Sequence, residues 1–158
     1  MFINTHMSNL TSNYNFLSPT GFKLVVNHDR LANLEYFATS VTLPSFNTGV
    51  VDLNSQQHKG YIQGDMTMDE LSLRVAIDED MKVYTEMFEW MIESRDEKLT
   101  SFDATLIIMT SHNNPNRSVQ FKNIFPVSMG SLEFNTQSSD IEYLQADISF
   151  RYDEFKFV

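Results

Sequence analysis

Near its end the chain alternates apolar and polar residues almost without exception, which leaves little choice of local structure. From residue 144 to residue 152, the apolar positions are Leu144, Ala146, Ile148, Phe150 and Tyr152. Successive side chains of a β-strand point to opposite faces of the sheet, so this period predicts a strand with one buried and one solvated face. Residues 71–77 alternate in the same way. Sheets with one solvated face are commonly antiparallel, and we expect that arrangement here.

One segment has the helical period instead. Asp78, Glu79 and Asp80 can cap a helix N-terminus and interact favourably with the helix dipole. Apolar residues then recur at spacings of three and four, at Val83, Tyr84, Met87, Phe88, Met91 and Ile92. This stripe predicts one α-helix at about residues 79–94 that packs against the sheet.

The remaining segments also favour strands. Aromatic residues make up 13% of the chain, and turn residues such as those at 112–116 separate apolar segments. We expect further strands at residues 22–26, 34–43, 102–111, 118–125 and 127–134. Because strands and helices do not alternate, the prediction is a mainly β protein: an antiparallel β-sandwich or partly closed barrel of about seven or eight strands with one flanking helix. We assign to its core Phe22, Phe37, Val75, Phe88, Ile148 and Phe150.

The chain divides into an N-terminal arm and one domain. Residues 1–20 are rich in Asn, Ser and Thr and are expected to form an extended arm that a partner orders. Residues 21–158 have the size of one ordinary domain. Inside it, residues 45–66 are polar and too long for a simple turn. Pairing of Val50-Val51 with Tyr61-Ile62 would make this segment a protruding hairpin.

The residues of known catalytic and metal-binding patterns are missing from the sequence. There is no cysteine, and the four histidines are not at metal-ligand spacing. The run Asp78–Asp80 does not fit a calcium loop, because Val83 occupies the position that requires glycine. We therefore expect no catalytic residues, no cofactor and no metal, and no enzymatic activity.

The chain is strongly acidic, with a net charge of −10. Tight binding to a nucleic-acid backbone needs basic residues that release counterions, so this charge argues against it. An acidic surface could instead let nucleic acid slide past without sticking. We expect neither a membrane span nor a secretory signal, because no apolar run is long enough for the former and Lys23 is the first lysine.

Five segments, in collinear order, match the pattern of a known family. They are residues 15–22 (NFLSPTGF), 36–44 (YFATSVTLP), 71–90, 125–143 and 150–155 (FRYDEF). The fourth segment begins with FPVSMGSL and ends with DIEY. Together they resemble the tail tube proteins of contractile-tailed, T4-type bacteriophages. The resemblance covers nearly the whole chain after residue 14.

This resemblance implies a tail-tube fold and a structural role. Six copies would close into a ring, and rings would stack into a tube that forms the conduit for DNA ejection. The implied partners are further copies, the tail sheath protein, the tape-measure protein and baseplate proteins, with DNA passing through the lumen unbound and no membrane contact. The protein would belong to the tail of the virion and assemble in the cytoplasm of the host bacterium.

Within such a tube, two groups of residues are candidates for contacts. Candidates for contacts between rings are the polar residues Asn47, Asn54, Gln57, His58 and Tyr61. Candidates for the lumen wall are the acidic residues Asp103, Glu142 and Asp147.

Several alternatives remain open at this stage. A tube initiator or baseplate hub subunit would have the same fold and form a single ring, and bacterial secretion machines also use tube rings. A small acidic hydrolase would use carboxylates such as Asp65, Asp69 and Glu70, although such groups occur in any acidic protein. A monomeric carbohydrate-binding sandwich would need exposed aromatic residues, whereas most of those here alternate inward.

Overall fold

The computed structural model describes residues 15–27, 31–54, 59–96, 101–137 and 143–158. Most of the N-terminal arm, as well as Gln57, His58 and Glu142, therefore lies outside the described residues. The elements are β1 (Phe22–Val26), α1 (Ala32–Phe37), β2 (Ala38–Thr42), β3 (Phe46–Asn54), β4 (Lys59–Met68), β5 (Leu71–Ala76), α2 (Lys82–Asp96), β6 (Phe102–Met109), β7 (Pro115–Met129), β8 (Gln145–Arg151) and β9 (Glu154–Phe157).

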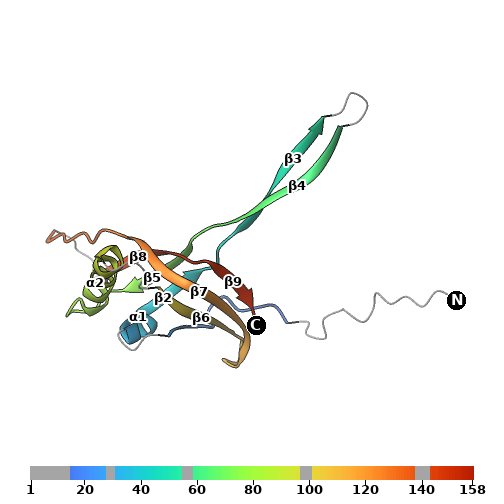
Figure 1. Cartoon of the computed structure of the whole chain (residues 1–158). Helices are drawn as coiled ribbons and strands as arrows, with labels where there is room; N and C mark the ends of the chain where they lie inside the picture. The colour runs from blue at the N-terminus through green and yellow to red at the C-terminus, as the bar shows by residue number, and fades with distance from the viewer. Residues whose placement is uncertain (1–14, 28–30, 55–58, 97–100, 138–142) are drawn as a thin grey trace.

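A β-rich body and a projecting hairpin make up the described chain (Figure 1). In the body the strand order is β1-β6-β7-β8-β5-β2, with β9 also beside β7. Every pairing in the described residues is antiparallel. The prediction of a mainly β, antiparallel fold with a flanking helix is therefore confirmed.

The long strand β7 belongs to two sheets. Its first half lies between β6 and β9, and its second half pairs with β8. We call β1, β6, β9 and the first half of β7 sheet 1, and β2, β5, β8 and the second half of β7 sheet 2. The two strands predicted at 118–125 and 127–134 are thus one strand, which ends at Met129.

At the junction of the two halves of β7, Asn123 has a positive φ of 53°. Its backbone N–H donates to Oδ1 of Asp103 at 3.2 Å, and its Nδ2 donates to Oδ2 of Asp153 at 2.7 Å. The register with β6 shifts between Phe102 and Ala104, next to this point. Asparagine tolerates the left-handed conformation better than most residues, which explains its place at this bend.

We expect Asn123→Val to lower the free energy of unfolding by about 2 kcal/mol, because a β-branched residue is strained at positive φ and the side-chain hydrogen bond is lost. Asn123→Gly keeps the backbone conformation and should lose at most about 1 kcal/mol. The fluorescence of Trp90, the only tryptophan, reports urea unfolding of both variants. Equal losses in the two variants would contradict this account of the bend.

The core lies between the two sheets and is covered by α2. Sheet 1 contributes Leu24, Val26, Ala104, Leu106, Val119 and Phe121, and sheet 2 contributes Leu71, Leu73, Val75, Ala146, Ile148 and Phe150. From α2, Trp90 packs against Phe102 and Phe150 with ring centroids 5.2 and 5.9 Å apart. The core assignments of Val75, Ile148 and Phe150 are confirmed. Phe22 and Phe37 are half-buried at its margin.

The assignment of Phe88 to the core is wrong, because its side chain is 57% exposed. The buried residues of α2 are Val83, Met87 and Trp90, spaced four and three apart. The buried face therefore includes Val83 and Met87 of the predicted stripe and continues to Trp90. Phe88, on the other side of the predicted stripe, is left exposed.

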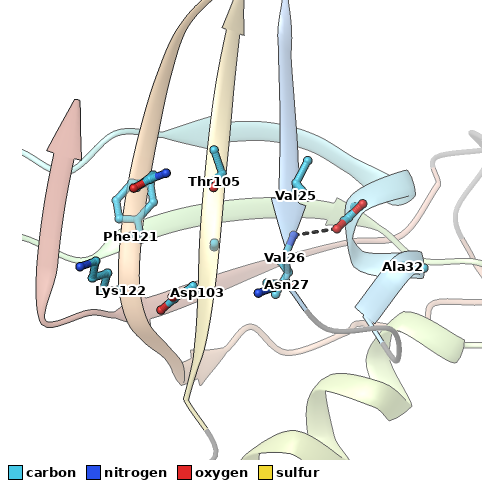
Figure 2. A pocket seen from close by; sticks show the side chains of 11 residues that line it. Val25, Val26, Asn27, Ala32, Asp103, Thr105, Phe121 and Lys122 are labelled. Carbon is cyan, nitrogen blue, oxygen red and sulfur yellow. Dashed lines mark hydrogen bonds between the residues drawn. The ribbon is translucent and has the colours of Figure 1, made fainter. Parts of the chain in front are cut away.

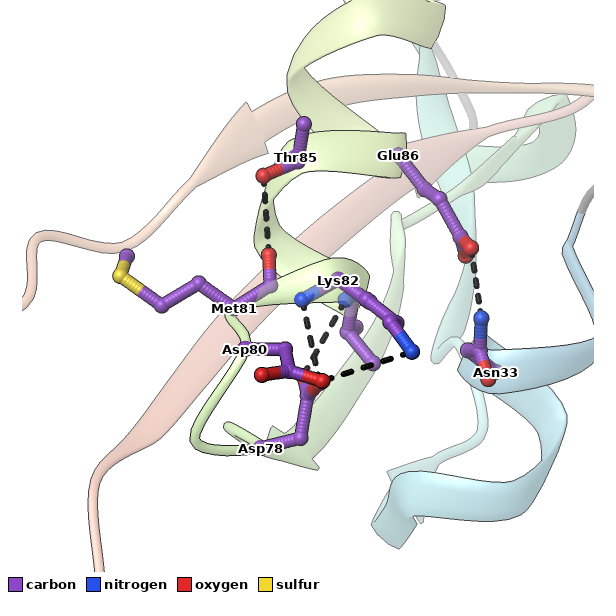
Figure 3. Close-up of polar contacts among 8 residues, drawn as sticks. Asn33, Asp78, Asp80, Met81, Lys82, Thr85 and Glu86 are labelled. Carbon is purple, nitrogen blue, oxygen red and sulfur yellow. Dashed lines mark hydrogen bonds and ion pairs between the residues drawn. The ribbon is translucent and has the colours of Figure 1, made fainter.

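The helix α2 begins at Lys82, three residues later than predicted. The Asp78 carboxylate accepts hydrogen bonds from the backbone N–H groups of Lys82 and Val83, at 3.2 and 3.4 Å (Figure 3). Asp78 therefore caps the helix as predicted, but across an intervening turn in which Met81 has a φ of 52°.

The first half of the strand predicted at 34–43 is instead the short helix α1. Leu31 and Leu34 are three residues apart and both are buried, which a helical turn allows and a strand does not. Glu35 of this helix accepts a hydrogen bond from the N–H of Val26 at 2.6 Å. Contacts with the body thus override the strand preference of Tyr36 and Phe37.

Candidate functional site

The hairpin of β3 and β4 is the part of the described chain that the body does not bury. It projects away from both sheets (Figure 1). The pairing of Val51 with Ile62, expected from the sequence, is present in the register. None of the described hairpin residues is buried. A two-stranded hairpin alone in water is marginally stable, so this hairpin needs further packing.

The outer half of the hairpin has one apolar face. Val51, Leu53 and Ile62 share this face, because Val51 is opposite Ile62 and Leu53 lies two residues further along β3. They are 53%, 49% and 49% exposed. We call these three residues the apolar hairpin face. A contiguous exposed apolar strip between polar residues is typical of a protein–protein contact.

The other face of the outer half is mixed. It carries Val50, Asp52, Asn54, Lys59, Tyr61 and Gln63, which pair across the two strands. The proposed ring-contact residues Asn54 and Tyr61 therefore lie on the face opposite the apolar one. Asn47 lies nearer the body, where its carbonyl accepts a hydrogen bond from Thr67 Oγ1 at 3.3 Å. Reasoning from polarity thus overlooked the apolar face. The sequence offered Val51 and Leu53, two residues apart, as a signal, but only the register places Ile62 on the same face.

A glycine pair marks the place where the two halves of the hairpin meet. The register shifts between Thr48 and Val50. A Cβ atom added at Gly64 would lie 3.1 Å from the carbonyl oxygen of Gly49. Only glycine at position 64 lets the two backbones approach this closely without displacement.

Among the described residues, sheet 1 has two edges that pair with no further strand, formed by β1 and β9. Hydrogen bonds from Met109 N–H to the Gly21 carbonyl and from Asn27 N–H to the Asp103 carbonyl fix which residues face β6. The alternate residues Phe22 and Leu24 therefore direct their backbone groups away from the sheet.

On the opposite side, Val158 and Ser118 exchange backbone hydrogen bonds of 2.8 and 3.2 Å. The alternation along β9 therefore directs the backbone groups of Phe155 and Phe157 outward. Unpaired edge groups of this kind are a template for pairing with another chain.

The lumen candidates Asp103 and Asp147 lie on different sheets. Asp103 is on the outward face of sheet 1, where it lines a pocket together with Asn27 and Lys122 (Figure 2). Asp147 is on the outward face of sheet 2, where Arg74 donates to it from Nε at 2.7 Å and from Nη2 at 3.2 Å. This hydrogen bonding lowers the pKa of Asp147. The structure therefore does not bring the two residues to one surface.

The outward face of sheet 1 is close to electrically balanced. It carries the exposed side chains of Lys23, Asp103, Lys122 and Lys156, together with half-buried Glu154. Lys122 lies 3.2 Å from Glu154, and hydrogen bonds from Lys156 and Lys122 lower the pKa of this glutamate. Most acidic residues of the chain thus lie elsewhere.

The carboxylates considered for a hydrolase do not converge. Asp69 accepts a hydrogen bond from Ser45 Oγ, Glu70 accepts one from Arg151 Nε at 3.0 Å, and Asp65 lies on the hairpin. Among the described residues there is no group of three or more His, Asp or Glu that could hold a metal ion. None of the described helices is long and apolar enough to cross a membrane.

Several aromatic side chains are exposed, contrary to the expectation that most point inward. Tyr36 lies on α1, Phe46 and Tyr61 on the hairpin, Phe88 on α2 and Phe157 on β9. They are distributed over separate elements, whereas a sugar-binding surface needs them on one platform.

Comparison with known proteins identifies the fold. No protein-family profile matches the sequence, and no curated protein sequence is similar to it. A chain of the PVC sheath–tube complex, from an extracellular contractile injection system in the extended state, has a TM-score of 0.74 at 16% identity and covers 93% of each chain. A chain of the anti-feeding prophage cap, which terminates the AFP tube, has a TM-score of 0.73 at 14% identity and covers 99% of each chain. Hcp1 of E. coli EAEC 042 has a TM-score of 0.53 at 8% identity, over 87% of this chain and 89% of that chain.

At these identities the similarity shows a shared fold. The resemblance seen in the sequence is therefore confirmed at the level of a tube-type fold, which is not limited to T4-type phages.

Proposed function

We propose that this chain is a structural subunit of the tube of a contractile machine, in which copies close into rings and rings stack. The exposed apolar hairpin face carries this proposal, because a fold shared with sheath–tube and tube-cap structures here presents an apolar surface that the described body does not cover. Residues 21–158 would form the ring-building domain, and residues 1–20 an arm ordered by a partner.

Ring closure would use the open edges of sheet 1. The β1 edge of one copy would pair with the β9 edge of the next, a head-to-tail contact that repeats until the ring closes. Six copies, as the sequence resemblance implies, would join their copies of sheet 1 into one barrel. Closing the barrel removes the open edges, which explains how an assembly protein can carry them.

In this arrangement the outward face of sheet 1 would line the lumen, with Asp103 on the wall. Asp147 would then lie outside the lumen. The wall would be far less acidic than the net charge of −10 implies, because Lys23, Lys122 and Lys156 offset its carboxylates. DNA passing through a phage tail would slide along a nearly neutral surface.

Stacking would use the hairpin, which is long enough to leave its own subunit. Its apolar face would pack on a copy in the next ring. Asn47, Asn54 and Tyr61 remain candidates for contacts between rings, Asn54 and Tyr61 through the opposite face of the hairpin. The sheath and the baseplate would be the further partners, with a tape-measure protein inside the tube during assembly of a phage tail in the host cytoplasm.

A second candidate is an end-piece that forms one ring. The fold similarity to a chain of a tube-terminating cap, as high as that to the sheath–tube chain, supports this possibility alongside the main tube. An initiator or baseplate hub ring would use the same edges for closure and present the hairpin to a different chain.

Negative-stain electron microscopy of the purified protein at high concentration, with mass from light scattering, tests the proposal. We expect six-fold rings or hollow tubes, and tubes favour the main tube over an end-piece. Single rings that do not stack favour the end-piece. A monomer at every concentration, with or without a preformed tube end as template, would contradict assembly of this chain by itself.

A further inference from the structure

The hairpin is a continuation of a strand pair in the body, interrupted by a short hinge. Strands β2 and β5 pair with each other in sheet 2, and Thr42 lies opposite Ser72. The chain then leaves through residues 43–45 into β3 and returns through Asp69 and Glu70 from β4. The direction of the hairpin therefore depends on how these few residues are held.

Two adjacent residues at the end of β8 hold the returning chain. The hydroxyl of Tyr152 donates a hydrogen bond to the carbonyl oxygen of Asp69 at 2.9 Å. Arg151 Nε donates to Glu70 Oε1 at 3.0 Å. Across the hinge, Asp69 N–H donates to the Ser45 carbonyl at 2.9 Å, and Ser45 Oγ donates to the Asp69 carboxylate. Asp69 is thus fixed from two directions.

The ring of Tyr152 is itself fixed by the core. It lies edge-on to Phe121, with centroids 5.1 Å apart, and beside Phe155 at 6.3 Å. Phe121 is fully buried. A rigid aromatic ring therefore connects the centre of the body to the backbone of the hinge. Burial raises the pKa of the Tyr152 hydroxyl above its ordinary value, which already keeps the group protonated at neutral pH.

We propose that Tyr152 is a positioning residue that sets the angle between the hairpin and the body, so that each copy presents its apolar hairpin face in the same direction. The proposal rests on the proposed role of the hairpin as a contact between copies. A flexible hairpin would have to be ordered at each contact, which weakens binding, whereas a hairpin held in place avoids that cost.

Tyr152→Phe removes the hydroxyl and leaves the aromatic packing. Because the chain has no cysteine, Lys59→Cys on the hairpin and Gln145→Cys on β8 provide two unique sites for spin labels. We expect the hairpin–body distance distribution of the unassembled protein to broaden in Tyr152→Phe. Tyr36→Phe, whose ring is exposed on α1, is the matched control and should keep the original distribution.

The unlabelled variant gives the second readout. The threshold concentration for tube formation should rise about fivefold in Tyr152→Phe, because a hairpin that has lost this internal hydrogen bond of about 1 kcal/mol must be ordered at each contact. Its urea midpoint should stay close to that of the wild type. Should Tyr152→Phe fail to fold, Ser45→Ala, which removes a hinge hydrogen bond at an exposed residue, should produce the same broadening.

The outcomes separate the two proposals. An unchanged distance distribution in Tyr152→Phe, or equal broadening in Tyr36→Phe, overturns the role of Tyr152 even if the wild type forms tubes. Failure of the wild type to assemble contradicts the proposed function, while the label distances still decide whether Tyr152 holds the hairpin.

Discussion

Ile62→Asp is expected to abolish tube formation and leave the subunit folded. Ile62 is at the centre of the apolar hairpin face and is half-exposed in the free subunit, so a carboxylate there is tolerated in solution. In the assembled state the same carboxylate would be buried without a partner, at a cost of roughly 3 kcal/mol or more per contact. The threshold concentration for assembly should rise at least about 100-fold, measured by sedimentation and electron microscopy.

Gln63→Asp provides the matched control for this experiment. Gln63 is the next residue along β4, is also exposed, and points to the mixed face of the hairpin. Both variants add one negative charge to the same strand. The difference between them is the face of the hairpin on which the charge is placed. Loss of assembly in both would show that the hairpin uses its polar face or that charge alone prevents stacking.

Phe121→Ala is expected to have the largest effect on folding, a loss of about 3–5 kcal/mol in the free energy of unfolding. Phe121 is fully buried, and its ring contacts Tyr152 and Phe155 at centroid distances of 5.1 and 5.4 Å. Its removal leaves a cavity beneath the strand that both sheets share. Urea unfolding followed by Trp90 fluorescence measures the loss.

Phe125→Ala serves as the comparison on the same strand. Phe125 faces outward and is partly exposed, so its truncation should cost about 1 kcal/mol or less. If the two variants were equally destabilised, the core would not be centred on Phe121, and the link from the core to the hinge through Tyr152 would lose its basis.

The period of apolar residues in the sequence predicted those strands and helices that have one buried and one exposed face. Strands β5 and β8 alternate without interruption, and α2 follows an acidic cap, so each was evident from the sequence. The helix α1 was missed because it is only six residues long and is fixed by the burial of Leu31 and Leu34 and by the hydrogen bond that Glu35 accepts from Val26. Phe88 was misassigned because two apolar stripes share the helix, and only the packing of Trp90 decides between them.

The candidate site was predictable in outline but not in detail. The hairpin was predicted from the pairs Val50-Val51 and Tyr61-Ile62 within the polar segment 45–66. Which of its faces is apolar depends on the register, and the register shift at Gly64 could not be derived from residue types. Likewise, Asp103 and Asp147 both stand on polar strand faces, but only the topology reveals that those faces belong to different sheets.

The unburied hairpin also has a consequence for the cell that makes this protein. Strand β3 is nine residues long, includes no proline and carries Asp52 as its single charge, so apart from the register shift near Gly49 it has little protection against aggregation as a free edge. Newly made subunits whose hairpin stays uncovered for long would be targets for chaperones and proteases. If the chain builds a tube as proposed, its synthesis would have to be matched to the supply of growing ends.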